Sequence, residues 1–313
     1  MSSNLTNYLR VAEWNVRSNI FGREKDVIRI MHDEKISLMF LTETDSEFII
    51  RDNFNIQNYT TFYPKKEEED EIDNVRIVCL ARNDTDVKFK LRPDLMSSQF
   101  SSIWVECRTS SSKKYLMGGC YREWTKNGDD SIEGQKARLH ILLDQIGEAS
   151  RECERVLIVG DMNLCSEKWN EKNYRYKSLS DPLLATLDTY GLNIANIGLT
   201  YEADHADVNG EYATSAIDHA YFSDACETTS STLSNSSSDH SPIVIGLNLG
   251  RSRPKKYTHV VEKRSFRGFN LNQFRMDLSC YNWEKLLQSD NVDEAAALYD
   301  AFIKQCLDKH API

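Results

Sequence analysis

Short apolar segments of strand length recur along the first 250 residues of the chain, separated by stretches with helical periodicity. Several of these segments are almost continuously hydrophobic, which is typical of strands covered on both faces. Strands and helices mixed over this length predict one layered α/β domain, residues 1–250. The predicted strands are Leu9–Trp14, Ile36–Leu41, Val75–Ala81, Ile103–Cys107, Tyr115–Tyr121, Val156–Val159, Ala216–Phe222 and Ile243–Leu247.

Two of the intervening stretches have clear helix signals. Residues 134–153 carry apolar side chains at helical spacing, which predicts one buried stripe. Residues 181–190 begin with Asp181 as a predicted N-cap and Pro182 at the first helical position, and Gly191 is the predicted C-terminal cap. The stripe of the longer helix comprises Leu139, Leu142, Leu143, Ile146 and Cys153.

Two further stretches have the composition of loops. The charge run Lys65–Glu71 predicts a solvated loop, and the Ser- and Thr-rich stretch Thr228–Ser238 predicts a flexible one.

The composition changes after residue 250. Residues 251–275 hold eight basic residues and one acidic residue, although the whole chain of 313 residues has a net charge of −10. This stretch permits a nucleic-acid partner, and it is equally compatible with a solvated linker. Two helices are predicted around 281–288 and 292–309, which together are too small for an independent core. We interpret residues 251–313 as a basic linker followed by a helical appendage.

Several broad classes of protein are disfavoured by the sequence. No run of about 18 apolar residues exists, so no membrane span is expected. The first residues lack a basic segment followed by an apolar one, so a secretory signal is not expected. Eight single cysteines without a CxxC pair favour reduced intracellular thiols over zinc ligands or disulfides. No GxxxxGK[ST] and no GxSxG motif occurs, which argues against a P-loop NTPase and a serine hydrolase.

Polar residues gather at the ends of the predicted strands. Ligand sites in α/β proteins commonly lie at strand ends, where loops present side chains from a rigid platform. Asp218 lies on a buried strand and needs a partner, for which His240 is a candidate, whereas His219 on the opposite face is expected to be structural. The polar residues at strand ends are Asn15, Glu43, Tyr121, Asp161, Asn163, Asp218, Asp239 and His240.

This set of residues suits phosphoester hydrolysis. Carboxylates without a cluster of Cys and His favour Mg²⁺ or Mn²⁺. A metal held by few carboxylates can polarise a phosphoryl oxygen, and another carboxylate can deprotonate a water. A histidine can donate to the phosphate oxygens as charge builds on them. The residues therefore predict a phosphodiesterase or a phosphatase.

The ordered series of motifs resembles the endonuclease/exonuclease/phosphatase superfamily over about residues 8–249. In finer detail it resembles the endonuclease domain of LINE-type non-LTR retrotransposons, through the Tyr-Arg-Glu-Trp sequence at 121–124, Gln135 and Arg138 on one helix, the stretch 168–174, and Thr200. The motifs are Trp14-Asn15-Val16, Leu41-Thr42-Glu43-Thr44, Gly160-Asp161-Met162-Asn163, Ser215-Ala216-Ile217-Asp218-His219 and Ser238-Asp239-His240-Ser241-Pro242.

The resemblance implies a DNase I-like four-layer sandwich, in which two β-sheets pack face to face and are flanked by helices, with a C-terminal helical appendage. It implies hydrolysis of one strand of double-stranded DNA to leave a 3′-hydroxyl, which can prime reverse transcription, and action in the nucleus. Residues 251–313 resemble the connector from such an endonuclease to a reverse transcriptase. The alternatives are a repair nuclease or a small-substrate phosphatase on the same fold, and a catalytically decayed or binding-only copy.

The resemblance also implies roles for individual residues. The implied ligands of Mg²⁺, with Mn²⁺ as the alternative ion, are Glu43, Asn15 and Asp239. The implied catalytic residues are Asp161, Asn163, His240, Asp218, Tyr121 and Asn15. The implied DNA contacts are Arg122, Arg17, Thr200 and Ser215. The loop 201–214, which approaches the DNA groove in such nucleases, carries acidic residues and no Lys or Arg.

Overall fold

The structure, a computed structural model, describes residues 8–46, 54–64, 75–110, 113–126, 128–206, 208–234, 237–249, 264–266 and 268–312. It divides into two compact units, Met1–Arg253 and Pro254–Ile313. The charge run Lys65–Glu71 lies outside the described residues. The same holds for residues 251–263 and 267 of the basic stretch.

The first of two six-stranded sheets is built around the N-terminal strand. Its strand order is β13-β14-β1-β2-β4-β3, with β1 parallel to β2 and the other neighbours antiparallel. The strands are β1 (Tyr8–Asn15), β2 (Leu38–Ser46), β3 (Tyr59–Phe62), β4 (Val75–Arg82), β13 (Thr228–Thr232) and β14 (Ile243–Asn248).

The second sheet has the order β5-β6-β7-β8-β12-β9, with β7 parallel to β8. A separate hairpin is formed by β10 (Tyr201–Ala206) and β11 (Tyr212–Ser215), within the segment 201–214. The strands of the sheet are β5 (Lys88–Leu91), β6 (Ser101–Arg108), β7 (Lys114–Tyr121), β8 (Val156–Asp161), β9 (Leu192–Ile194) and β12 (Asp218–Ser223).

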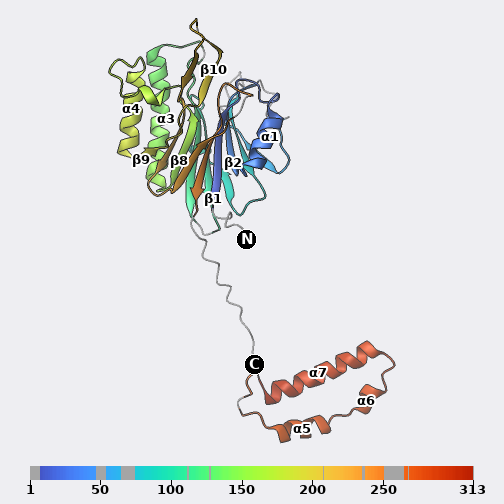
Figure 1. The fold of residues 1–313 in the computed structure, drawn as a ribbon. Coiled ribbons are helices and arrows are strands. Elements are labelled where there is room, and N and C mark those ends of the chain that lie inside the picture. The colour runs from blue at the N-terminus through green and yellow to red at the C-terminus, as the bar shows by residue number, and fades with distance from the viewer. Residues whose placement is uncertain are drawn as a thin grey trace. The chain divides into compact units, whose positions relative to one another are not determined.

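Alternation along the strands places the two sheets face to face. On β1, Leu9 and Val11 belong to the core shared with the second sheet, whereas Ala12 and Trp14 belong to the core under α1 (Glu24–Asp33). On the other side, α3 (Ile132–Glu152) and α4 (Lys177–Thr189) cover the second sheet (Figure 1). The predicted four-layer DNase I-like sandwich is therefore confirmed, with α1 as one outer layer and α3 and α4 as the other.

Two local predictions are wrong. Helix α4 begins at Lys177, so Asp181 is not its N-cap and Pro182 lies inside the helix. Pro182 removes one backbone hydrogen bond there, but the helix buries an apolar stripe of Leu179, Leu183 and Leu187 against the second sheet. Thr228–Thr232 forms an edge strand instead of a loop, because threonine suits a half-exposed strand paired on one side.

Other helix ends follow the sequence signals. Gly191 follows α4 with φ of +62°, as predicted for a C-terminal cap. Helix α3 begins after Ser131, whose side chain accepts a hydrogen bond from the Gly134 N–H.

The second unit consists of α5 (Leu271–Ser279), α6 (Glu284–Leu287) and α7 (Val292–His310). Its side chains meet mainly through aromatic contacts, such as the stacked rings of Tyr281 and Phe302, whose centroids are 3.7 Å apart. Among the described residues of this unit, only Cys306 and Ala311 are buried apolar side chains. No helix in the described part of the chain combines the length and the apolar character needed to cross a bilayer.

Candidate active site

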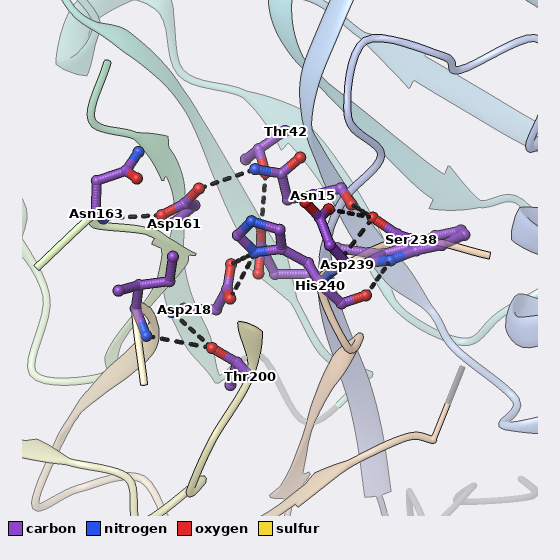
Figure 2. Close-up of polar contacts among 12 residues, drawn as sticks. Asn15, Thr42, Asp161, Asn163, Thr200, Asp218, Ser238, Asp239 and His240 are labelled. Atoms are coloured by element: carbon purple, nitrogen blue, oxygen red, sulfur yellow. Dashed lines mark hydrogen bonds and ion pairs between the residues drawn. The ribbon is translucent and has the colours of Figure 1, made fainter. Parts of the chain in front are cut away.

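Side chains from both sheets meet where the ends of β1 and β8 lie opposite each other (Figure 2). Asn15 ends β1 in the first sheet, and its Nδ2 donates a 2.9 Å hydrogen bond to Oδ2 of Asp161, which ends β8 in the second. The backbone N–H of Asn163 donates to the other carboxylate oxygen of Asp161 at 2.8 Å. Both oxygens of this fully buried carboxylate therefore accept hydrogen bonds.

A second contact between the sheets joins Asp218 and His240. Asp218 is the first residue of β12 and lies opposite Asp161 in the strand register. His240 precedes β14, and its Nδ1 lies 2.9 Å from Oδ2 of Asp218 and 3.1 Å from Oδ1. The Trp14 indole fixes the His240 backbone by donating to its carbonyl at 3.0 Å. The partner predicted for Asp218 is therefore present, and Nε2 is the His240 nitrogen left to meet a substrate.

The charges of this cluster support acid and base chemistry. Burial disfavours the charged form of His240, but the charge and hydrogen bond of Asp218 outweigh it and raise the pKa of His240 to about 10. Burial, followed by the charge of Asp218, raises the pKa of Asp161 to about 7. His240 is therefore an imidazolium at neutral pH, and Asp161 is a base whose pKa lies near neutrality.

A third contact between the sheets joins Glu43 and Tyr121. Glu43, on β2 with φ of +50°, accepts a 2.9 Å hydrogen bond through Oε1 from the Tyr121 hydroxyl at the end of β7. Arg76 Nη2 donates to the same hydroxyl oxygen at 3.0 Å. Burial, together with the charges of Glu43 and Asp161, raises the pKa of Tyr121, so its phenol remains a proton donor.

A pocket of about 440 Å³ opens over these residues. Its lining includes Glu43, Asn163, Asp239 and His240. Asp161 is buried next to them, where its carboxylate accepts the hydrogen bond from the Asn163 backbone N–H. Two carboxylates, Glu43 and Asp239, therefore face the same space as the imidazole.

The oxygen ligands in this pocket suit a divalent cation. Glu43 and Asp239 line the pocket with two carboxylates, and hard cations such as Mg²⁺ prefer oxygen ligands of this kind. One ligand atom from each of Asp161, Asp218 and His240 also lies within 4.8 Å of the other two. That buried cluster fits a metal less well, because His240, paired with Asp218, is an imidazolium and neither ring nitrogen has a free lone pair for a metal.

Arg17 links the pocket to the β10–β11 hairpin. Its guanidinium forms an ion pair with Asp204 on the hairpin, and it lies 3.5 Å from Oδ2 of Asp239. The Arg17 backbone has φ of +50°, and its N–H donates to Oδ1 of Asn15 at 2.9 Å. About half of the Arg17 side chain is exposed, so this cation is accessible to a phosphate.

Two of the four residues expected to contact DNA are buried inside the protein, which corrects the expectation for these two. Arg122 is 1% exposed, and its guanidinium donates to Gln135 Oε1 at 2.9 Å and to the Asn163 carbonyl at 2.8 Å. Thr200 is 2% exposed, and its hydroxyl accepts from the backbone N–H of Asp218 at 3.1 Å. Both side chains hold the backbone around the pocket in place, whereas Ser215 and Arg17 do line the pocket.

Glu13 also lies at the site, although no sequence motif pointed to it. This residue lies on the inner face of β1, fully buried, and accepts a 2.8 Å hydrogen bond from the Thr42 hydroxyl through Oε1. Its Oε2 has no hydrogen-bond partner among the described residues. Burial, then the charges of Asp218 and Asp161, raise the pKa of Glu13. The alternation Val11, Glu13, Asn15 along β1 was the available signal, because it places all three on one strand face.

Comparisons with known proteins agree with this architecture. Residues 117–244 match the family model described as endonuclease-reverse transcriptase. Among solved structures, the chain is similar to the endonuclease domain of TRAS1, a telomere-specific non-LTR retrotransposon, with 19% identity and a TM-score of 0.57. That match covers 78% of this chain and 100% of the other.

Two further solved structures share the fold. An endonuclease/exonuclease/phosphatase family protein from Bacteroides thetaiotaomicron is 14% identical with a TM-score of 0.54, over 77% of this chain and 97% of that one. TDP2 from D. rerio, complexed with single strand DNA product, is 13% identical with a TM-score of 0.52, over 77% and 99% of the two chains. No curated protein matches this sequence.

Proposed function

We propose that this chain, which has the fold of the endonuclease/exonuclease/phosphatase superfamily and resembles its retrotransposon endonucleases, is a metal-dependent DNA endonuclease. It hydrolyses a phosphodiester in one strand of double-stranded DNA and leaves a 3′-hydroxyl. The observation that carries this proposal is the ion pair of Asp218 and His240, which lies beside Asp161 at a pocket that also holds Glu43 and Asp239.

Each residue has a defined part in the proposed reaction. Asp161, held by Asn15 and Asn163, accepts a proton from the attacking water, whose oxygen forms the new bond to phosphorus. The bond from phosphorus to the 3′ oxygen breaks, and that oxygen takes up a proton from solvent and leaves as the 3′-hydroxyl. His240, as an imidazolium, donates to the phosphate oxygens as negative charge builds on them.

The residues at the pocket wall complete the mechanism. Tyr121 presents a protonated phenol next to Glu43, where it can donate to a phosphate oxygen. Glu43 and Asp239 would hold a divalent ion, Mg²⁺ or Mn²⁺ by ligand type, which would supply charge neutralisation for the phosphate and the leaving oxygen.

A second candidate is hydrolysis of a small phosphoester. The net charge of −10 and the acidic residues Glu202, Asp204 and Glu211 on the hairpin segment favour it, because affinity for duplex DNA comes mainly from neutralising phosphates. The similar solved structures favour DNA as the substrate, since one is a retrotransposon endonuclease domain and another was determined with single strand DNA product.

A plasmid-nicking assay separates the two candidates. We expect the full chain with Mg²⁺ to convert supercoiled plasmid to open circles, and a DNA polymerase to extend the nicks without prior treatment of their ends. The Asp161→Asn variant, purified in the same way, controls for contaminating nucleases. Release of phosphate from a panel of phosphomonoesters without any nicking would establish the small-substrate activity instead.

We further propose that residues 251–313 connect the proposed endonuclease domain, residues 1–250, to a reverse transcriptase on a longer polypeptide. We also propose that the protein acts in the nucleus. The description of the matched family model, endonuclease-reverse transcriptase, supports this arrangement. Sequencing the transcript beyond the codon for Ile313 tests the first point, and imaging a fluorescent fusion of the full polypeptide tests the second. A stop codon directly after residue 313, or a fusion excluded from the nucleus, would contradict them.

A further inference from the structure

Three aromatic rings form one wall of the pocket, and the proposed mechanism uses none of them. Trp124 follows β7, whereas Tyr174 and Tyr176 precede α4. The ring centroids of Trp124 and Tyr176 are 4.8 Å apart, and those of Tyr174 and Tyr176 are 5.9 Å apart. We call these three residues the aromatic wall. Lys168, at the end of the short helix η3 (Ser166–Lys168), lines the same pocket.

Hydrogen bonds hold this wall next to the reacting groups. The Trp124 Nε1–H donates a 2.7 Å hydrogen bond to Oδ1 of Asn163, whose backbone N–H in turn bonds Asp161. The Tyr174 hydroxyl accepts from the backbone N–H of Cys165 at 2.9 Å. The guanidinium of the buried Arg122 lies 5.0 Å from the centre of the Trp124 ring. The wall is therefore preorganised, and only two hydrogen bonds separate Trp124 from the Asp161 carboxylate.

Accessible aromatic rings beside a phosphate site suit a nucleobase. Trp124 is 37% exposed, although a side chain of this kind is usually covered when it has only a packing role. Bases stack on aromatic rings in a way that tolerates any sequence, because every base has a π face. A base inside a duplex is already stacked on its neighbours, so only an unpaired or displaced base can use such a wall.

We propose that the aromatic wall is a subsite for one unpaired nucleobase of the cleaved strand, directly beside the scissile phosphate. Lys168, which lines the same pocket, then offers a cation to a neighbouring phosphate of that strand. This inference rests on the proposed endonuclease function and predicts a preference for duplex DNA that is unpaired at the cut.

Matched oligonucleotide duplexes test the subsite. They differ only at one nucleotide next to the cut, which is paired, mismatched, or abasic. We expect the wild-type chain to have a KM roughly tenfold lower for the mismatched duplex than for the abasic one, as expected for one stacked base. Trp124→Ala and Tyr176→Ala should remove this preference through KM, whereas Trp124→Phe and Tyr176→Phe should keep it, because they keep a ring.

A binding measurement gives a readout that does not depend on cleavage. We place 2-aminopurine at the same position in the Asp161→Asn variant and follow its fluorescence. Stacking should quench the signal on binding, and the additional Trp124→Ala or Tyr176→Ala change should restore it, with folding verified by circular dichroism for every variant.

The outcomes separate this inference from the proposed function. Nicking by the wild-type chain, without a difference between mismatched and abasic duplexes and without quenching, overturns the subsite and leaves the endonuclease intact. Failure to nick any of the duplexes or the plasmid overturns the endonuclease function. In that case the quenching of 2-aminopurine, and its loss in the alanine variants, alone decides whether the aromatic wall binds a base. Quenching that survives both alanine changes also overturns the subsite.

Discussion

The Asp218 carboxylate lies 2.9 Å from Nδ1 of His240, and this ion pair bridges the two β-sheets of the sandwich. Asp218 begins β12 in the second sheet, and His240 precedes β14 in the first. Two further polar pairs of the candidate site also cross between the sheets, namely Asn15 with Asp161 and Glu43 with Tyr121. The geometry of the site therefore depends on how the sheets pack, and packed cores resist small displacements.

Loss of either the proposed base or the proposed cationic donor should abolish nicking while the fold persists. We expect Asp161→Asn and His240→Ala to lower the nicking rate by about 100-fold or more, because one loses the base and the other the cationic donor. Plasmid nicking measures the effect, and circular dichroism verifies the fold. The conservative change Asp33→Asn, on an exposed residue of α1, serves as the control. A wild-type rate in either site variant would contradict the mechanism.

The charge on His240 should depend on Asp218. In the wild-type protein the pKa of His240 is about 10, raised mainly by Asp218 against the opposing effect of burial, so the ring is charged below that pH. Asp218→Asn removes the negative partner, and we expect the pKa of His240 to fall by at least one unit. The variant then loses the imidazolium as pH rises through this lower value, so its nicking rate falls on the alkaline side. NMR titration of the ring proton measures the shift, and an unchanged titration would refute the assignment.

The fold could be predicted because its strands are marked by apolar runs. The hydrophobic side chains of β1, β8 and β14 face two layers, so burial dominates and the sequence alone indicates a doubly covered sheet. The pairing of Asp218 with His240 was also predictable, since a carboxylate on a buried strand requires a partner. Edge elements such as β13 could not be predicted, because a strand with one exposed face and one neighbouring strand has the composition of a loop.

The expected DNA contacts show why single residues are harder to predict. Arg122 follows a strand end, where a cation usually faces solvent, but Gln135 on α3 and the Asn163 carbonyl accept from its guanidinium inside the protein. Nothing local in the sequence reveals that α3 passes over this strand end. Trp124 belongs to the Tyr-Arg-Glu-Trp sequence at 121–124, but its contact with Asn163 depends on the docking of two loops that are distant along the chain.

Arg17 should couple metal binding to DNA binding. In the structure its guanidinium neutralises Asp239 in the pocket and Asp204 on the hairpin. Arg17→Gln frees Asp239, so we expect half-maximal activity at a lower Mg²⁺ concentration. The same change removes one phosphate contact, so DNA affinity should fall and the slope of its logarithm against that of salt concentration should decrease by about one.

The matched control for this prediction is Arg10→Gln. Arg10 also forms an ion pair at 2.8 Å, with Glu34, but at the opposite end of β1 from the site. We expect Arg10→Gln to leave both the salt slope and the Mg²⁺ requirement unchanged. Equal slopes for wild type and Arg17→Gln in fluorescence anisotropy with labelled duplex would show that Arg17 does not contact the phosphates.

His219 should make the fold sensitive to mild acid. Its Nε2 lies 3.1 Å from the Ala216 carbonyl oxygen and its Nδ1 lies 2.6 Å from the Tyr221 hydroxyl, so both nitrogens of a neutral ring have a hydrogen-bond partner. Burial lowers the pKa of His219 to about 4. The unfolded chain, with a pKa near 6.5, takes up the proton first, so stability is complete above pH 6.5 and decreases as pH falls toward 4. The loss attributable to this residue approaches roughly 3 kcal/mol in the free energy of unfolding. Urea unfolding at pH 7 and pH 4.5 should show a smaller decrease for His219→Gln than for wild type, and equal decreases would contradict the assignment.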